Sequence, residues 1–197
     1  MGVNLAKKEK VSLEKSGGLS RIFMGLGWDM AKPKASGFFG KMLGSSSDSE
    51  DIDLDASCLM LDANKKIVDT VWFHQLKSND GSVVHKGDNL TGAGDGDDEV
   101  ITVDLTHLPS NVTNLVFVIS SFRGQTFDKI EAAFCRLVDA TKNTELARYQ
   151  LSGKNSSTAQ IMAQVYKENG AWTMQAIGES TNGRTVQDFA DQVKNMV

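Results

Sequence analysis

Short stretches rich in β-branched and aromatic residues recur along the chain, separated by polar or glycine-containing turns. Such stretches are typical of β-strands with one buried and one exposed face. An Asn-Gly pair at 169–170 adds a strong signal for a β-hairpin. The pattern predicts strands over Val3–Leu13, Arg21–Asp29, Asp51–Leu61, Ile67–Phe73, Val100–Leu105, Leu115–Ser121, Ala132–Val138, Leu146–Leu151, Ala159–Tyr166 and Ala171–Ile177.

Helical periodicity is confined to the end of the chain, where four apolar residues share one helix face: Val186, Phe189, Ala190 and Val193. Thr185 and Asp188 before them resemble a weakened capping box. About ten short strands and one C-terminal helix favour a mainly β fold, a β-sandwich whose loops gather at its ends. We predict a single domain over residues 1–197, with residues 31–50, rich in Gly, Ser and Lys, as a flexible insertion.

The acidic balance of the chain is created locally. The sequence has 21 Lys and Arg against 25 Asp and Glu, a formal net charge of −4. Five of these acids lie between Gly87 and Glu99, and without them 21 basic residues face 20 acidic ones. The sequence carries no basic stripe interleaved with aromatic residues, so we expect no nucleic acid partner.

The lack of a targeting signal in the sequence and the isolated cysteines lead us to expect a cytoplasmic protein. The sequence contains no apolar run long enough for a transmembrane segment, and charges at Lys7, Lys8 and Lys10 interrupt the region where a signal peptide needs an apolar core. Cys58 and Cys135 stand alone in apolar contexts, as expected for buried thiols in a reducing compartment.

The stretch Gly87–Glu99 holds five carboxylates, four glycines and no basic residue. Two carboxylates about 4 Å apart repel by roughly 4 kcal/mol at an effective dielectric near 20, so a cation is expected among them. Oxygen ligands select hard ions, and Ca²⁺ accepts more oxygens in looser geometry than Mg²⁺. The spacing does not fit an EF-hand, because Leu90 and Gly92 occupy ligand positions. A solvated acidic turn is the alternative.

A second acidic cluster lies at Asp51, Asp53 and Asp55, whose alternation places all three on one side of a strand. We interpret it as the other wall of the same metal site, since loops of a sandwich converge at its ends. Asp29, at the end of a predicted strand, is a further candidate. The alternative is a solvent-facing strand edge that carries charges against aggregation.

Signatures of enzymes are weak. The sequence has no Gly-x-Ser-x-Gly elbow and no glycine-rich loop followed by lysine. The three histidines lack zinc-type spacing and are interpreted as structural, with His85 of interest because it lies three residues before Asp88. Three tryptophans embedded in apolar strands are expected in the core: Trp28, Trp72 and Trp172. The acidic clusters could also hold Mg²⁺ for phosphoryl transfer, which we keep as the alternative function.

Three ordered motifs resemble the TerD family of bacterial tellurium-resistance and stress-response proteins: Gly25–Asp29, Asp53–Ala56 and Gly87–Glu99. Ser121–Gln125 and Ala147–Tyr149 look most like the TerZ branch. The resemblance covers the whole chain and implies a cytoplasmic calcium-binding β-sandwich, associated with resistance to tellurite, some phages and pore-forming colicins. From the charge of the acidic stretch and its place at a sheet end, we hypothesise a non-enzymatic, calcium-dependent module that docks to other Ter proteins or membrane-associated proteins, including peripheral association with the inner membrane.

The resemblance implies which residues bind metal, because they occupy the positions of the family's motifs. The number of carboxylates exceeds what one ion needs, so we expect two adjacent calcium ions. Ala93 stands where many relatives carry Glu. The predicted ligands are Asp53, Asp55, Asp88, Asn89, Asp97, Asp98 and Glu99, with Asp29 and Asp95 as additional candidates. A third hypothesis, direct chemistry on tellurite by Cys58 or Cys135, lacks an activating neighbour in the sequence.

Overall fold

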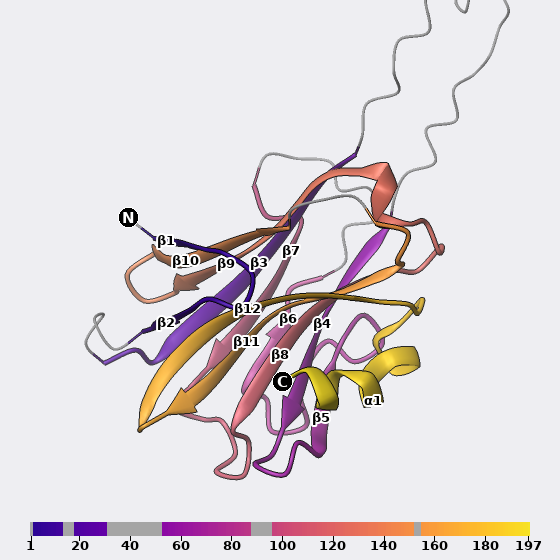
Figure 1. The fold of residues 1–197 in the computed structure, drawn as a ribbon. Coiled ribbons are helices and arrows are strands. Elements are labelled where there is room, and N and C mark those ends of the chain that lie inside the picture. The colour runs from indigo at the N-terminus through magenta and orange to yellow at the C-terminus, as the bar shows by residue number, and fades with distance from the viewer. Residues whose placement is uncertain (1, 14–17, 31–52, 88–95, 152–154) are drawn as a thin grey trace, which may run out of the picture.

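Two six-stranded sheets form the protein in the computed structural model, which describes residues 2–13, 18–30, 53–87, 96–151 and 155–197 (Figure 1). The first sheet, sheet A, has the strand order β1-β10-β9-β3-β7-β6. Its strands are β1 (Val3–Leu5), β3 (Arg21–Met30), β6 (Val83–His85), β7 (Glu99–Asp104), β9 (Ile130–Asp139) and β10 (Thr144–Leu151).

The second sheet, sheet B, has the order β2-β12-β11-β8-β4-β5. Its strands are β2 (Lys10–Ser12), β4 (Leu54–Leu61), β5 (Ile67–Val71), β8 (Asn114–Ser121), β11 (Ala159–Glu168) and β12 (Ala171–Thr181). A short 3-10 turn, Phe127–Lys129, precedes β9. Pairing is antiparallel throughout sheet B. Because successive side chains of a strand point to opposite faces, alternate residues face the other sheet.

The main core fills the space between the sheets. Met24 of β3 and Leu137 of β9 join Met60 of β4 and Phe117 of β8 there, each without exposed surface. Trp28 is also buried in this core, whereas Trp72 and Trp172 are only half-buried against the clusters. The expectation of a core role is therefore confirmed in full for Trp28 alone.

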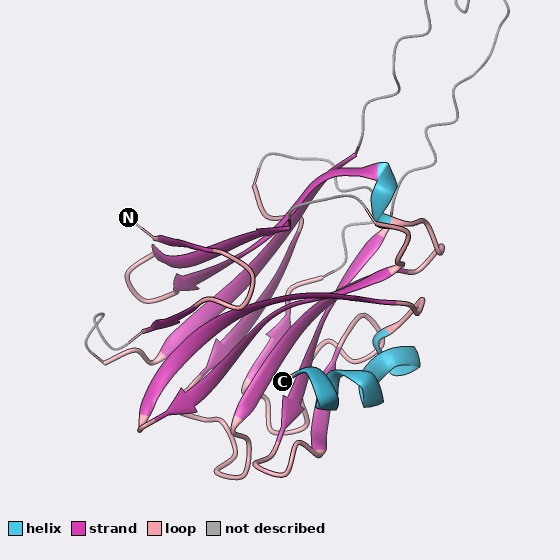
Figure 2. Ribbon diagram, in the orientation of Figure 1, coloured by secondary structure: helices cyan, strands magenta, loops and turns pink. Residues whose placement is uncertain are grey.

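The helix α1 (Val186–Met196) covers the outer face of sheet B (Figure 2). Its residues Val186, Phe189 and Val193 pack in a second buried cluster with outward-facing residues of β4, β8 and β11. Thr185 and Asp188 form the capping box at its start, as the sequence predicts. The apolar stripe thus closes a second, smaller core on one side of the sandwich.

The predicted β-sandwich with a C-terminal helix is confirmed, with two differences in its strands. The single strand expected over Val3–Leu13 is wrong, because a turn with Lys8 at φ 69° divides it. β1 pairs with β10 in sheet A, while β2 pairs with β12 in sheet B. β6 is a strand beyond the ten predicted; it forms an edge of sheet A, pairs with β7 and ends two residues before the acidic stretch begins. The predicted insertion, residues 31–50, lies outside the described residues.

Candidate functional site

Glu99, the last acid of the acidic stretch, is buried at the junction of the two sheets. Its Oε2 atom accepts the backbone N–H of Ala56 on β4 at 2.6 Å. Because β5 pairs only with Cys58–Leu61, no described strand lies along that edge of β4 near Ala56, and Glu99 supplies an acceptor. This bond brings the two acidic clusters of the sequence together.

His85 completes the setting of Glu99 from the neighbouring strand β6. Its Nδ1 atom accepts the N–H of Gly87 at 3.2 Å, which places the imidazole proton on Nε2. Nε2 lies 3.2 Å from Glu99 Oε2, so the ring donates to the carboxylate. Both side chains are 1% exposed. The sequence singled out His85 by its distance from Asp88, and the structure gives it a structural role beside Glu99.

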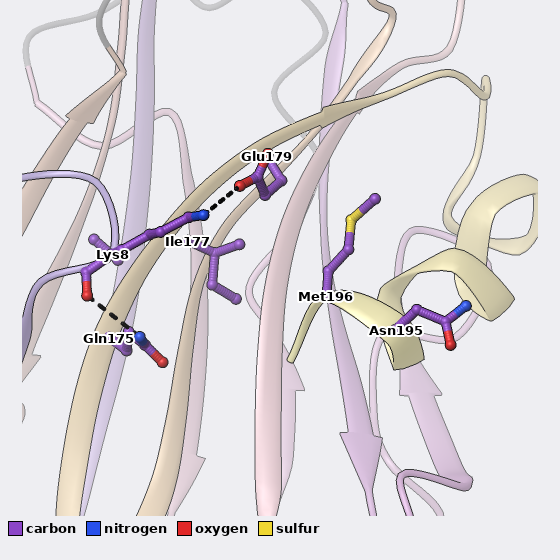
Figure 3. Close-up of a pocket in the computed structure, with 7 residues that line it drawn as sticks. Lys8, Gln175, Ile177, Glu179, Asn195 and Met196 are labelled. Atoms are coloured by element: carbon purple, nitrogen blue, oxygen red, sulfur yellow. Dashed lines mark hydrogen bonds and ion pairs between the residues drawn. The ribbon is translucent and has the colours of Figure 1, made fainter.

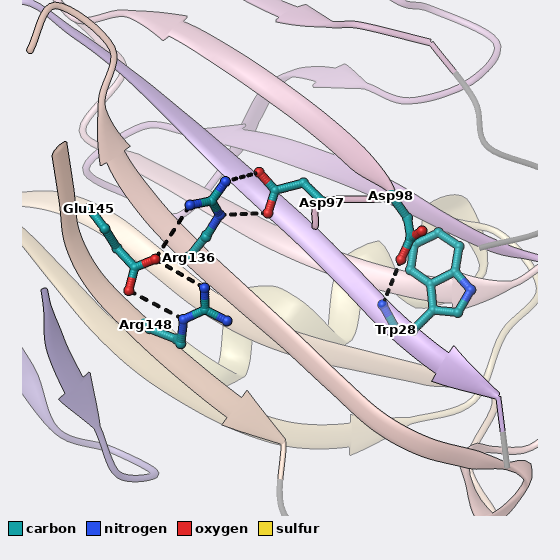
Figure 4. A network of polar contacts seen from close by, with 6 residues as sticks. All are labelled: Trp28, Asp97, Asp98, Arg136, Glu145 and Arg148. Carbon is teal, nitrogen blue, oxygen red and sulfur yellow. Dashed lines mark hydrogen bonds and ion pairs between the residues drawn. The ribbon is translucent and has the colours of Figure 1, made fainter. Parts of the chain in front are cut away.

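Asp98 is bound to β3 through the backbone. Its Oδ2 atom accepts the N–H of Trp28 at 2.7 Å, and its own N–H donates to the carbonyl of Leu26 at 2.8 Å (Figure 4). The acidic stretch is therefore fixed next to the Gly-Trp-Asp segment, which the sequence analysis placed at the same end of the sandwich. Asp29 is the next-to-last residue of β3 and pairs with Ala132 of β9.

Asp97 lies on the outer face of sheet A, where Arg136 of β9 binds it with two hydrogen bonds (Figure 4). Nε to Oδ1 is 2.7 Å and Nη2 to Oδ2 is 2.8 Å, and the Asp97 side chain is only 7% exposed. The bonds to Asp97 raise the pKa of the Arg136 guanidinium above its usual range. The stretch itself has no basic residue, as the sequence shows, and the basic partner of Asp97 lies 39 residues further along the chain.

Glycines in β3 make this close pairing possible. A Cβ atom at Gly25 would overlap the Asp97 carboxyl group, and one at Gly27 would overlap the ring of Phe134. Gly25 and Gly27 therefore leave room for the Asp97 carboxyl group and the Phe134 ring to lie directly on the backbone of β3. The arginine continues into a network, since Glu145 pairs with both Arg136 and Arg148.

Asp53 and Asp55 form the second wall of the candidate site, and each is only 5% exposed. Asp55 pairs in register with Ser120 of β8, and Leu54 with Ser121. Arg123 follows β8, and its Nε atom lies 3.7 Å from Asp53 Oδ2. The alternative of a solvent-facing charged edge is wrong for these two residues, because both are buried. Buried carboxylates need partners. Asp51 lies outside the described residues.

The remaining predicted ligands fall where the structure gives no description: Asp88, Asn89 and Asp95. The Asp29 side chain is likewise undescribed. Within the described ranges, no group of three or more His, Cys, Asp and Glu side chains forms a metal-binding cluster. The described residues thus hold part of the predicted donor set, all of it oxygen, and bring it to one end of the sandwich.

Both cysteine thiols are buried and free. Burial raises the pKa of Cys135 to about 12, and it also raises the pKa of Cys58. A thiol of this kind holds its proton and is a poor nucleophile at neutral pH. The geometry therefore weighs against tellurite chemistry at these residues.

A separate hollow of about 390 Å³ lies over β12 beside the C-terminal turn of α1 (Figure 3). The Lys8 ammonium group pairs with Glu179 at 3.6 Å, and the Gln175 amide donates to the Lys8 carbonyl at 3.3 Å (Figure 3). Asn195 and Met196 of α1 border it. Its charged groups are exposed and already paired with each other, so it offers no activated group for catalysis.

Comparison with known sequences gives a family. The TerD domain matches residues 1–192. Tellurium resistance protein TerZ of Serratia marcescens is 47% identical, over 99% of this chain and 98% of the relative. Stress response protein SCP2 of Bacillus subtilis (strain 168) is 41% identical, over 96% and 98%. Tellurium resistance protein TerD of Serratia marcescens is 38% identical, over 93% of each chain.

Solved structures with a similar fold include SCO6318 of Streptomyces coelicolor A3(2), a homologue of telluride resistance protein (TerD). It superposes with a TM-score of 0.67 over 90% of this chain and 98% of its own, at 20% identity. SAV2460, a protein of unknown function, gives 0.65 over 88% and 95%, at 23% identity. At these identities the likeness supports the β-sandwich fold.

Proposed function

The chain belongs to the TerD family of tellurium-resistance and stress-response proteins, and we propose that it acts there as a non-enzymatic, calcium-dependent interaction module. The resemblance to this family is confirmed. Identity to TerZ of Serratia marcescens exceeds identity to TerD of the same organism, in agreement with the predicted TerZ-like branch.

The observation that carries the calcium proposal is the burial of acidic side chains at the end of the sandwich where the acidic stretch leaves β6 and enters β7. Asp53, Asp55 and Glu99 are each no more than 5% exposed, and Glu99 is bonded to the residue after Asp55. Burying several carboxylates near one another is costly unless cations or donors compensate them. Arg123 and His85 are two of the groups that contact these carboxylates.

The donor chemistry fits a hard cation. Carboxylate and amide oxygens suit Ca²⁺, and the glycines of the stretch allow carbonyls to turn inward. The bound ion would supply positive charge that joins the two acidic clusters. Asp97 is the predicted ligand with a competing partner, since Arg136 already binds both of its oxygens. The proposed ligands are Asp29, Asp53, Asp55, Asp88, Asn89, Asp95, Asp98 and Glu99, for one or two ions.

In this proposal the ordered loops present a docking face to other Ter proteins or to membrane-associated proteins in the cytoplasm. In the part of the chain that the structure describes, no helix is both long enough and apolar enough to cross a bilayer. A family named for resistance and stress response, together with two inert thiols, supports a binding role. Phosphoryl transfer with Mg²⁺ stays the alternative and would show as turnover of phosphate esters by the same preparations.

Calorimetric titration with Ca²⁺ in excess Mg²⁺ tests the proposal. We expect a saturable calcium heat below millimolar concentration, strongly reduced by Asp55→Asn. Asp80→Asn removes the same charge at an exposed turn and should leave the heat unchanged. A wild-type protein that gives no saturable heat below millimolar calcium would refute the proposal.

A further inference from the structure

An aromatic surface lies beside the candidate metal site and takes no part in it. It comprises five side chains, called the aromatic patch: Trp72, Phe73, His74, Phe122 and Arg184. Phe122, at the end of β8, is 41% exposed and meets Phe73 edge to face, with ring centroids 5.4 Å apart. Trp72 and His74 continue the stack at centroid distances below 5 Å from Phe73.

The backbone holds the patch rigidly. Trp72 and Gln75 exchange two backbone hydrogen bonds, which places Phe73 and His74 at the tip of a tight turn. Phe122 and Arg123 lie in a second turn, closed by the bond from Gly124 N–H to the Ser121 carbonyl at 3.0 Å. Gly124 adopts φ 80°, which favours glycine. A preformed surface loses little freedom on binding, which favours recognition of a partner.

Arg184 gives the patch its specificity. Its guanidinium carbon lies 5.5 Å from the centroid of the Phe122 ring, and its Nε atom donates to the Phe122 carbonyl at 2.7 Å. In the described part of the chain, its Nη1 and Nη2 atoms donate to no acceptor. A guanidinium that lies over an aromatic ring, with its two terminal NH2 groups bonded to no described residue, is suited to bind a carboxylate.

Arg123 links the patch to the candidate metal site. It neighbours Phe122 and pairs with Asp53 at 3.7 Å, longer than a hydrogen bond. Near the patch, the charges of Arg123 and Arg184 are balanced by Asp53 and Asp188. The Asp188 carboxylate accepts the backbone N–H groups of Arg184 and Thr185. A calcium ion that takes the Asp53 carboxylate would release Arg123 and leave the surface with a positive balance.

We propose that the aromatic patch is the docking surface for an acidic segment of a partner protein that also carries apolar side chains, and that calcium strengthens this docking by releasing Arg123 from Asp53. The inference rests on the proposed calcium binding for its second part. Trp, Phe and Arg are the residue types enriched at the centres of protein interfaces. Anionic lipid, in contrast, is typically bound by clusters of about four to eight Lys or Arg, and two arginines face this patch.

The test uses a fluorescein-labelled peptide of alternating Glu and Leu, a matched peptide of alternating Lys and Leu, and vesicles of phosphatidylserine and phosphatidylcholine. Fluorescence anisotropy of the full chain is measured with calcium and with a chelator. We expect binding of the Glu-Leu peptide only, strengthened by calcium, with amide chemical-shift changes at Phe73, Phe122 and Arg184. Shift changes confined to another surface would overturn the proposal.

Variants separate the patch from general charge effects. Phe122→Ser and Arg184→Gln should each weaken peptide binding about tenfold, as expected for central interface residues. Arg21→Gln removes the same charge at an exposed site on β3 and should have no effect. All three residues are exposed, so the variants are expected to fold, and thermal melting checks this. If Phe122→Ser and Arg184→Gln fold and bind the peptide with unchanged affinity, the patch is not the docking surface.

Calorimetry on the same samples distinguishes the two proposals. A calcium heat without peptide binding overturns the docking inference and leaves calcium binding intact. Peptide binding at the patch without a calcium heat refutes the part of the inference in which calcium strengthens docking, and it supports the aromatic patch as the docking surface. Binding to the vesicles in place of the peptide overturns the protein partner in favour of lipid.

Discussion

The two outer faces of the sandwich are stabilised in different ways. On sheet B, α1 buries Val186, Phe189 and Val193 to 1% exposure or less. On sheet A, half-buried arginines lie over aromatic rings, with Arg148 4.4 Å from the Phe134 centroid and Arg136 5.8 Å from that of Phe23. One face depends on apolar burial and the other on paired charge.

Because the two outer faces are stabilised differently, changes that affect overall stability can be separated from changes that affect the candidate site. Among the described residues, the cluster under α1 includes none of the predicted ligands, whereas the arginine face holds Asp97 and therefore the end of the acidic stretch (Figure 4). Changes under α1 should lower the stability of the whole domain. Changes on the arginine face should act chiefly on the acidic stretch.

The largest expected effect is on the α1 face. Phe189→Ala should lower the free energy of unfolding by about 3–5 kcal/mol, because it removes a fully buried ring and leaves a cavity. The matched change on sheet A, Phe134→Ala, should cost only about 1 kcal/mol, since that ring is half-buried and loses mainly a cation–π contact. Urea denaturation monitored by circular dichroism measures both, and equal losses would remove the proposed distinction.

Calcium should give the next largest effect. At a free concentration 100 times its Kd, an ion that binds only the folded state adds about 2.7 kcal/mol to stability. Asp53→Asn should abolish this gain in thermal melting, whereas Asp97→Asn should keep most of it, because Arg136 already binds Asp97. A greater loss in Asp97→Asn would make Asp97 a primary ligand. Arg123→Gln should bind calcium at least as tightly as the wild type, since it removes a competing cation.

Removing Arg136 should have a smaller effect. Arg136→Gln leaves the nearly buried Asp97 without its charged partner and should cost about 2 kcal/mol. The double variant Arg136→Gln, Asp97→Asn should regain part of this loss, because no unpaired charge remains. Denaturant unfolding of the two single variants and the double variant gives the coupling energy. A coupling energy near zero would show that the pair contributes nothing to stability.

The smallest effect concerns Glu145, whose pKa is lowered chiefly by hydrogen bonds from Arg148. A lowered pKa in the folded state means that its contribution is present above pH 4.5, its ordinary value, and is lost as pH falls through the folded value. Comparison of the wild type with Glu145→Gln across this range should show the difference shrinking on acidification. Because Glu145 is partly exposed, we expect a small change, and a pH-independent difference would contradict the assignment.

Local patterns in the sequence predicted most of the fold but less of the site. Alternating apolar residues located the long strands, and the spacing of Val186, Phe189 and Val193 located α1, because both signals depend on near neighbours in the chain. The division of Val3–Leu13 was missed, since pairing of its halves with different sheets is a long-range event. The acidic clusters and His85 were found from composition and spacing.

The partners of the acids were missed for the same reason. Arg136 pairs with Asp97 across β3, and neither residue carries a local sign of the other. A charged residue in the apolar strand around Phe134 and Cys135 was the available signal, since it needs a partner on its face of the sheet. The aromatic patch was missed because its rings come from two turns that are distant in sequence.

The hydrogen bond from Ala56 to Glu99 has a consequence for observing this protein. A charge-assisted bond of 2.6 Å at a buried strand edge should strongly retard the exchange of that one amide hydrogen with deuterated solvent. The rate at this position would rise if the Glu99 carboxylate turned outward toward an ion. The exchange rate of the Ala56 amide hydrogen therefore reports the orientation of the Glu99 carboxylate.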